Sequence, residues 1–170
     1  LKGRGGGGFA VFEKWKLCLE KSTDSKLIPY LVCNSSIIEP LPALVIEGLL
    51  IAAITLEAKT AHVCFRHEHS AEMERFNEEI EKARKAGLIG KNIMNSGIDF
   101  EIHLHRGAGG YVIGESSALL QTLIGKVSEP QPKYIHAAET GINKHPVLVH
   151  NIETWANIPL IFDKKGCCDS

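Results

Sequence analysis

The sequence predicts an α/β fold in which helices flank an at least partly parallel sheet. Apolar segments of strand length alternate with segments that repeat apolar residues at helical spacing, as in βαβ units. The 170 residues suffice for one well-cored domain, and the 44% hydrophobic fraction is ordinary for a globular protein. Two glycine-rich turns complete the pattern, because such folds bind ligands at the carboxyl ends of their strands. The formal net charge of −1 gives no indication of nucleic-acid binding.

The first predicted strand spans Lys26–Cys33 and leads into a polar loop that starts at Asn34. A helix over Ala43–Leu56 follows, with Pro42 suited to its first turn. This segment is the most apolar in the chain, but it is shorter than the roughly 20 residues of a membrane span and contains Glu47. We therefore expect it to be a buried helix of a soluble protein.

The second predicted strand, Ala61–Arg66, precedes the clearest helix of the chain. Ser70 is suited to cap this helix, and Gly87 is suited to end it. Apolar residues at helical spacing form one face of the helix: Met73, Phe76, Ile80 and Ala83. On the opposite face we expect two i,i+4 ion pairs, Glu78/Lys82 and Glu81/Lys85.

The remaining elements are one strand, two helices and a long loop. Ile98–His105 alternates apolar and polar residues, as a half-buried strand does. Glu115–Leu123 is a predicted helix, and Ser128–Pro146 is rich in loop-forming residues. The last predicted helix covers Asn151–Phe162, with an interruption near Pro159.

The cysteines form no C-x-x-C pair, so the sequence shows no zinc or iron–sulfur framework. An odd number without regular spacing indicates reduced thiols in an intracellular compartment. Because the chain begins at Leu1 rather than at a methionine, we expect its natural amino terminus, with any targeting segment, to lie further upstream. The five cysteines are Cys18, Cys33, Cys64, Cys167 and Cys168.

The first glycine-rich turn, Gly3–Phe9, contains the spacing of the dinucleotide fingerprint, although the strand that should precede it is absent. Backbone N–H groups without a neighbouring Cβ approach a phosphate closely. The alternative is a flexible glycine loop. Arg4 and Lys14 favour the phosphate site, because cations beside bare amides suit an anion.

The second turn, Arg106–Glu115, lacks that fingerprint because Val112 stands at the third glycine position. It joins a strand to a helix and contains Tyr111, which could stack on a flat ring. The alternative is a tight connection in which Tyr111 only packs at the rim.

Histidines at alternate positions raise the possibility of a metal site, because two such side chains share one face of a strand. No third ligand has a compelling spacing, so we interpret these residues as surface or core histidines. The histidines concerned are His62, His67, His69, His103 and His105. No metal site, Ser/His/Asp triad or paired-carboxylate site is predicted.

Taken in order, several short motifs of the chain resemble one known family. The motifs are Gly3–Phe9 with Lys14-Trp15, Tyr30–Asn34 with Glu39-Pro40, Ile46–Gly48, Ala86–Ile93, Asp99–Glu101, Arg106–Glu115 and Asn151–Thr154. Together they resemble the FMN- and NADH-binding flavoprotein of respiratory complex I (NADH-quinone oxidoreductase), the 51 kDa type. Related subunits occur in NAD-linked hydrogenases and formate dehydrogenases. The resemblance covers nearly the whole chain and implies a Rossmann-like FMN-binding domain.

The resemblance also implies which residues contact the cofactors FMN and NAD. Glu39 and Glu115 match the family positions nearest the site of hydride transfer from NADH to FMN. NADH would contact Phe9, Glu39 and Lys133. FMN would contact Gly3, Arg4, Gly5, Gly6, Lys14, Asn34, Tyr111, Gly114, Glu115, Asn151 and Thr154.

The implied activity is that of an NADH dehydrogenase, an oxidoreductase of electron transport. Electrons pass from NADH through FMN to iron–sulfur partner subunits of a complex I-like assembly, and onward to quinone. We expect residues 1–170 to form a single, incomplete FMN- and NADH-binding domain, without the family's C-terminal iron–sulfur domain and its [4Fe–4S] cluster. The resemblance implies that the chain does not itself span a membrane. It also implies a location in the bacterial cytoplasm or on the matrix side of the mitochondrial inner membrane.

The chain departs from the family pattern at several site positions. Ser36 and Ile37 stand in a loop where the family carries acidic residues, and Ser116 replaces a second carboxylate near the nicotinamide. His136 stands where the family carries an aromatic, and His150 replaces the first of two paired asparagines. These departures keep two alternatives open: a degenerate, non-catalytic paralogue acting as an assembly or interaction module, and a fragment that does not fold stably.

Overall fold

The computed structural model describes most of the chain. The described residues are 1–3, 10–35, 41–107, 116–123, 125 and 141–163. In chain order the elements are α1 (Val11–Ser25), β1 (Tyr30–Ser35), α2 (Pro42–Leu56), β2 (Thr60–Phe65), α3 (Ser70–Lys85), the 3₁₀ turn η1 (Ile93–Asn95), β3 (Glu101–Arg106), α4 (Ser116–Leu123), β4 (Val147–Asn151) and α6 (Ile152–Asp163).

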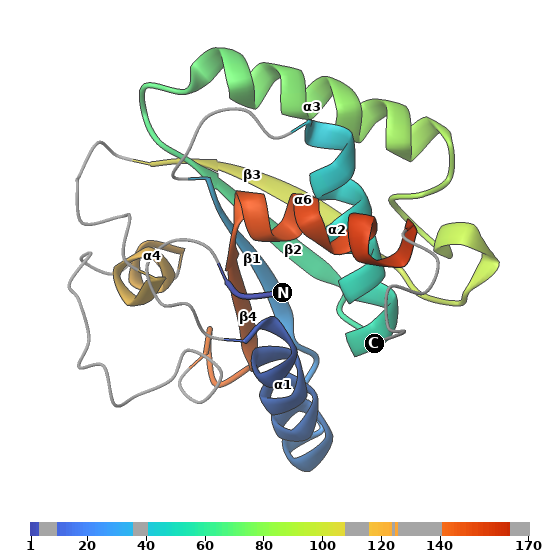
Figure 1. Cartoon of the computed structure of the whole chain (residues 1–170), viewed down its shortest axis with the longest axis vertical. Helices are drawn as coiled ribbons and strands as arrows, with labels where there is room; N and C mark the ends of the chain where they lie inside the picture. The colour runs from blue at the N-terminus through green and yellow to red at the C-terminus, as the bar shows by residue number, and fades with distance from the viewer. Residues whose placement is uncertain (4–9, 36–40, 108–115, 124, 126–140, 164–170) are drawn as a thin grey trace, which may run out of the picture.

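The four strands form one sheet in the order β3-β2-β1-β4, and every neighbouring pair is parallel. The chain steps outward from β1 through β2 to β3, and then returns to place β4 on the other side of β1 (Figure 1). The predicted α/β class with a mostly parallel sheet is confirmed. The strand order reverses between β1 and β4, which gives the sheet a defined switch point.

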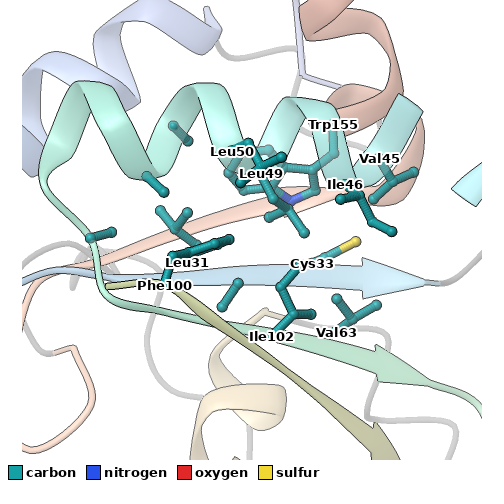
Figure 2. Close-up of a cluster of buried hydrophobic side chains, with 14 of the residues drawn as sticks. Leu31, Cys33, Val45, Ile46, Leu49, Leu50, Val63, Phe100, Ile102 and Trp155 are labelled. Atoms are coloured by element: carbon teal, nitrogen blue, oxygen red, sulfur yellow. The ribbon is translucent and has the colours of Figure 1, made fainter. Parts of the chain in front are cut away.

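The two faces of the sheet carry different layers. Helices α2, α3 and α6 cover one face, where side chains of all four strands join a large apolar core. Figure 2 shows Leu31, Cys33 and Val63 of the strands gathered beneath Leu49 of α2 and Trp155 of α6. Helix α4 covers part of the opposite face, and Figure 1 shows it apart from the other helices. Its smaller cluster comprises Val32, Cys64, Leu119, Leu120, Ile142, Val147 and Val149.

Helices α2 and α6 approach each other closely at Gly48. A Cβ added there would lie 2.2 Å from the backbone oxygen of Trp155. Pro159, four residues after Trp155, lacks the N–H that would normally bond to that oxygen in a helix. Gly48 of α2 therefore packs directly against the backbone oxygen of Trp155. Pro159 leaves that oxygen without its usual hydrogen-bond donor in the helix. Pro159 lies inside α6 and does not interrupt it, so the predicted interruption is wrong.

The apolar helix α2 begins as predicted, with Pro42 in its first turn. Most of its residues are buried, because the sheet, α6 and α3 surround it. Across the described residues, no helix combines the length and apolar character that crossing a membrane requires. The described cysteines Cys18, Cys33 and Cys64 are free and buried.

Several local predictions for α3 are wrong in detail. Ser70 is its first helical residue, and the capping position before it is His69, which makes no side-chain cap. The expected i,i+4 ion pairs are replaced by i,i+3 pairs, Lys82 with Glu79 and Arg84 with Glu81. Arg84 also donates a hydrogen bond of 2.8 Å to the carboxylate of Glu101 in β3, and this contact orients the Arg84 side chain toward β3.

Besides the short turn η1, one helix and one strand were not predicted. Helix α1 buries only Val11 and Cys18, which is too sparse a pattern to mark a helix in the sequence. Strand β4 follows Pro146 directly and has five residues, all of them buried. The sequence pattern assigns its first four residues to no element and Asn151 to the last helix, because a short buried strand lacks the alternation that reveals a half-exposed one.

Candidate functional site

The candidate site lies at the carboxyl edge of β1 and β4, where the strand order reverses. Asn34 of β1 and Asn151 of β4 are register partners at this edge. In open α/β sheets, ligands bind outside the carboxyl ends of the strands at such a reversal. The fold therefore brings two of the predicted cofactor contacts, separated by more than half the chain, side by side.

Asn151 also directly precedes helix α6. Its Oδ1 accepts a hydrogen bond of 2.9 Å from the N–H of Glu153, the second residue of the helix. This capping pattern satisfies one of the N–H groups that a helix start leaves without a helical partner. Thr154 lies fully buried in the same first turn. The amino end of α6, with its partial positive charge, thus lies at the site edge.

Lys14 approaches the site from α1. It is half-buried, and burial lowers the pKa of its ammonium group. Within the described part of the chain, no hydrogen bond or ion pair engages Lys14. A partly desolvated cation without a counter-charge is unfavourable by itself, and an anion beside it relieves that cost.

His150 precedes Asn151 and contacts the start of α1. Trp15 Nε1 of α1 donates a hydrogen bond of 3.1 Å to His150 Nε2. Burial first, and then the positive charge of Lys14, lower the pKa of His150 to about 3. Because Lys14 directly precedes Trp15, this hydrogen bond places the start of α1 at the end of β4 that carries Asn151.

The flanks of both predicted glycine turns are described. Lys2 and Ala10 form an antiparallel bridge, so the two ends of the first turn meet immediately before α1. The second turn follows β3, where the N–H of Gly107 bonds to Phe65 O over 2.8 Å, and leads to α4. The described structure therefore fixes the residues on either side of each turn.

Of the predicted site residues, the structure describes five. Asn34, Asn151, Thr154 and Lys14 gather around the β1/β4 edge, while Gly3 lies at the start of the first turn. The other nine lie outside the described residues: Arg4, Gly5, Gly6, Phe9, Glu39, Tyr111, Gly114, Glu115 and Lys133. Trp15 contacts the site in a way that the sequence did not indicate, because its partner His150 is 135 residues away.

Three histidines meet on the sheet face that α4 leaves partly open. His62 Nδ1 lies 2.8 Å from His105 Nε2, and the rings of His62 and His103 stack at 5.6 Å. The prediction that His103 and His105 share a strand face is confirmed, whereas His67 and His69 lie in the loop after β2. Among the described residues, no group of three His, Cys, Asp or Glu side chains is arranged to hold a metal ion.

Two surface hollows of the described structure lie away from this edge. One, of about 610 Å³, is an apolar groove between α2 and α3 that includes Ile51, Ile54 and Met94. The other, of about 570 Å³, lies near the amino end of β1 and includes Lys26 and Pro29. Neither hollow is lined by any of the predicted site residues.

Comparison with known proteins identifies relatives along nearly the whole chain. The family model described as the Nuo51 FMN-binding domain matches residues 1–160. The NADH-quinone oxidoreductase subunit designated F in Escherichia coli (strain K12) is 40% identical over 172 residues, covering 95% of this chain and 38% of the relative. The NADP-reducing hydrogenase subunit HndC of Solidesulfovibrio fructosivorans is 38% identical, covering 95% of this chain and 34% of the relative.

A solved structure supports the same relationship. The crystal structure of an NAD⁺-reducing [NiFe]-hydrogenase in the H₂-reduced state matches with a TM-score of 0.81 and 27% sequence identity. The match covers 96% of this chain and 29% of that chain. The present chain thus spans less than half the length of the curated relatives reported above, 38% and 34% of them.

Proposed function

The chain belongs to the Nuo51 FMN-binding domain family, and from that premise we propose that it binds FMN at the β1/β4 edge and oxidises NADH as a flavoprotein subunit of NADH dehydrogenase type. In this proposal residues 1–170 act as one FMN- and NADH-binding domain. Bound FMN supplies the chemistry, which is acceptance of a hydride from NADH and release of the electrons singly. The protein binds and orients the two cofactors.

The observation that carries the proposal is Lys14. Its half-buried ammonium group has no anionic partner among the described residues. The next residue, Trp15, bonds to His150, which directly precedes the Asn151 that caps α6. Such a cation and a helix amino terminus form a site suited to a phosphate. FMN carries a phosphate, so the described residues fit this group.

The remaining assignments extend this site along the edge. We assign Asn34 and Thr154, with Asn151, to the flavin, because carboxamides and a hydroxyl suit its polar ring edge. We assign Glu39 and Glu115 to the neighbourhood of the reacting rings. Further FMN contacts are proposed for Gly3, Arg4, Gly5, Gly6, Tyr111 and Gly114, and NADH contacts for Phe9, Glu39 and Lys133.

The proposal includes partners and a location. Electrons would leave the flavin for iron–sulfur subunits of a complex I-like or hydrogenase-like assembly, because the relatives reported above are named as subunits of such enzymes. The location proposed is the bacterial cytoplasm or the matrix side of the mitochondrial inner membrane.

The experiment is a titration of the expressed chain with FMN, read by quenching of the flavin fluorescence. We expect binding at micromolar concentrations, and Lys14→Met should weaken it about tenfold, since a hydrogen bond to a charged group contributes about 1.5–3 kcal/mol. Lys16→Met is the matched control, because Lys16 lies two residues away on the exposed side of α1 and pairs with Glu20. Absence of binding, or equal effects of the two variants, would refute the FMN site.

Anaerobic addition of NADH to the flavin-loaded chain tests the second half of the proposal. Bleaching of the flavin absorbance is expected of an NADH dehydrogenase domain. A chain that binds flavin without bleaching would instead be a non-catalytic assembly module, which the loss of carboxylates at Ser36 and Ser116 favours.

A further inference from the structure

Both tryptophans of the chain meet at one imidazole. Trp15 of α1 donates from Nε1 to His150 Nε2 over 3.1 Å, and Trp155 of α6 meets the same ring edge-on at a centroid distance of 5.2 Å. The two indoles lie 6.4 Å apart. Side chains from α1, β4 and α6 therefore converge on His150, which is itself buried.

The hydrogen bond determines the protonation state of His150. Its Nε2 accepts from an indole that can only donate, so the ring is neutral and carries its proton on Nδ1. Burial and the nearby Lys14 hold the pKa of His150 at about 3. The imidazole consequently remains an acceptor at all physiological pH values.

This contact connects the first turns of α1 to the end of β4. In α1 only Val11 and Cys18 are buried, so the helix has few other apolar anchors. Lys14 directly precedes Trp15, and fixing the indole fixes the rotation of α1 about its axis and therefore the direction of the Lys14 side chain. The family pattern carries an asparagine at position 150, and its side chain is shorter than an imidazole.

We propose that His150 is a positioning residue, which accepts the Trp15 hydrogen bond, holds the start of α1 against β4 and thereby directs Lys14 to the flavin phosphate. The proposal rests on FMN binding at the β1/β4 edge. It assigns His150 no contact with the cofactor, so its effect is transmitted through Lys14 alone.

The test compares FMN with riboflavin, which lacks the phosphate, in titrations of the whole chain. His150→Leu removes the acceptor, whereas His150→Gln retains an acceptor atom at similar reach. We expect His150→Leu to weaken FMN binding about tenfold and riboflavin binding by less than about twofold, and His150→Gln to restore most of the FMN affinity. A packing role would weaken both ligands equally, and that result would overturn the proposal.

A double variant tests transmission through Lys14. Adding His150→Leu to Lys14→Met should weaken FMN binding no further, because the two residues then act on one contact. Independent, additive losses would show that His150 acts on the ligand by another route and would contradict the proposal.

Amide hydrogen exchange tests the positioning role of His150 without any flavin. Failure of the chain to bind flavin would therefore refute the FMN site and leave this test intact. His150→Leu should speed amide exchange in the first turns of α1 about tenfold, while His150→Gln should leave it near the wild-type rate. Trp15→Phe keeps an aromatic ring without the donor and should reproduce the effect, should His150→Leu fail to fold. Unchanged exchange in a folded variant lacking the hydrogen bond would overturn the proposal.

Discussion

The two faces of the sheet contrast in how they are packed. The face beneath α2 and α6 is almost wholly apolar, and the helices approach so closely that only glycine fits at position 48. The face beneath α4 has a smaller apolar cluster and, beside it, three histidines, of which His62 contacts both His103 and His105. One face thus holds most of the buried apolar residues, while the other tolerates polar side chains. The contrast predicts that changes on the first face affect folding most.

The largest effect is expected for Gly48→Ala. The added Cβ would overlap a backbone carbonyl of α6, which cannot rotate away as a side chain can. Overpacking typically costs about 1–3 kcal/mol and occasionally more, and we expect this substitution to exceed that range because the clash is with backbone. Such a loss is a large part of the roughly 5–15 kcal/mol by which native proteins are stable. Urea unfolding measures the loss, and Glu47→Ala on the exposed side of α2 is the control. A loss below about 1 kcal/mol would show that α2 and α6 separate easily.

The same substitution on the two faces measures their difference directly. Leu49 faces the larger core and Leu119 the smaller cluster, and both are buried. Leu→Ala costs about 2–5 kcal/mol, more where the surroundings cannot close around the cavity. We expect a loss in unfolding free energy of about 3 kcal/mol for Leu49→Ala and about 2 kcal/mol for Leu119→Ala, measured by urea unfolding of variants whose denaturant dependence is unchanged. Equal losses would remove the distinction between the faces.

A smaller effect is expected from pH on the histidine side. Burial first, and then repulsion from His105 and His103, lower the pKa of His62 to about 4. Below its unfolded pKa of about 6.5 the unfolded chain binds the proton first, so stability falls as pH falls from about 6.5 toward 4.

The matched variants for this pH effect are His62→Gln and His67→Gln. Because His62 remains partly exposed, we expect the loss between pH 7.5 and pH 5 to shrink by about 1 kcal/mol in His62→Gln. His67→Gln serves as the control for the loss of a histidine, because His67 is exposed in the loop after β2 and away from the histidine group. An identical pH dependence in wild type and His62→Gln would contradict the contribution of the buried imidazole.

Sequence patterns located the elements whose apolar residues repeat regularly. The strands around Leu31 and Val63, the apolar helix after Pro42 and the amphipathic helix around Phe76 all appear where they were predicted. The ordered motifs also identified the family, because their combination is specific although each motif is weak. Helix α1 and strand β4 were missed, since their burial comes from partners distant in sequence rather than from a local pattern.

By itself, the sequence determined the α/β class, the regular elements and the family, all of which depend on local periodicity or on the order of short motifs. Only the tertiary structure decided the strand order that pairs Asn34 with Asn151, and the meeting of Trp15 with His150 across 135 positions. The physical reason is that both follow from packing between distant segments. A one-dimensional pattern carries no information on which buried strand pairs with which, or on which donor reaches a buried acceptor.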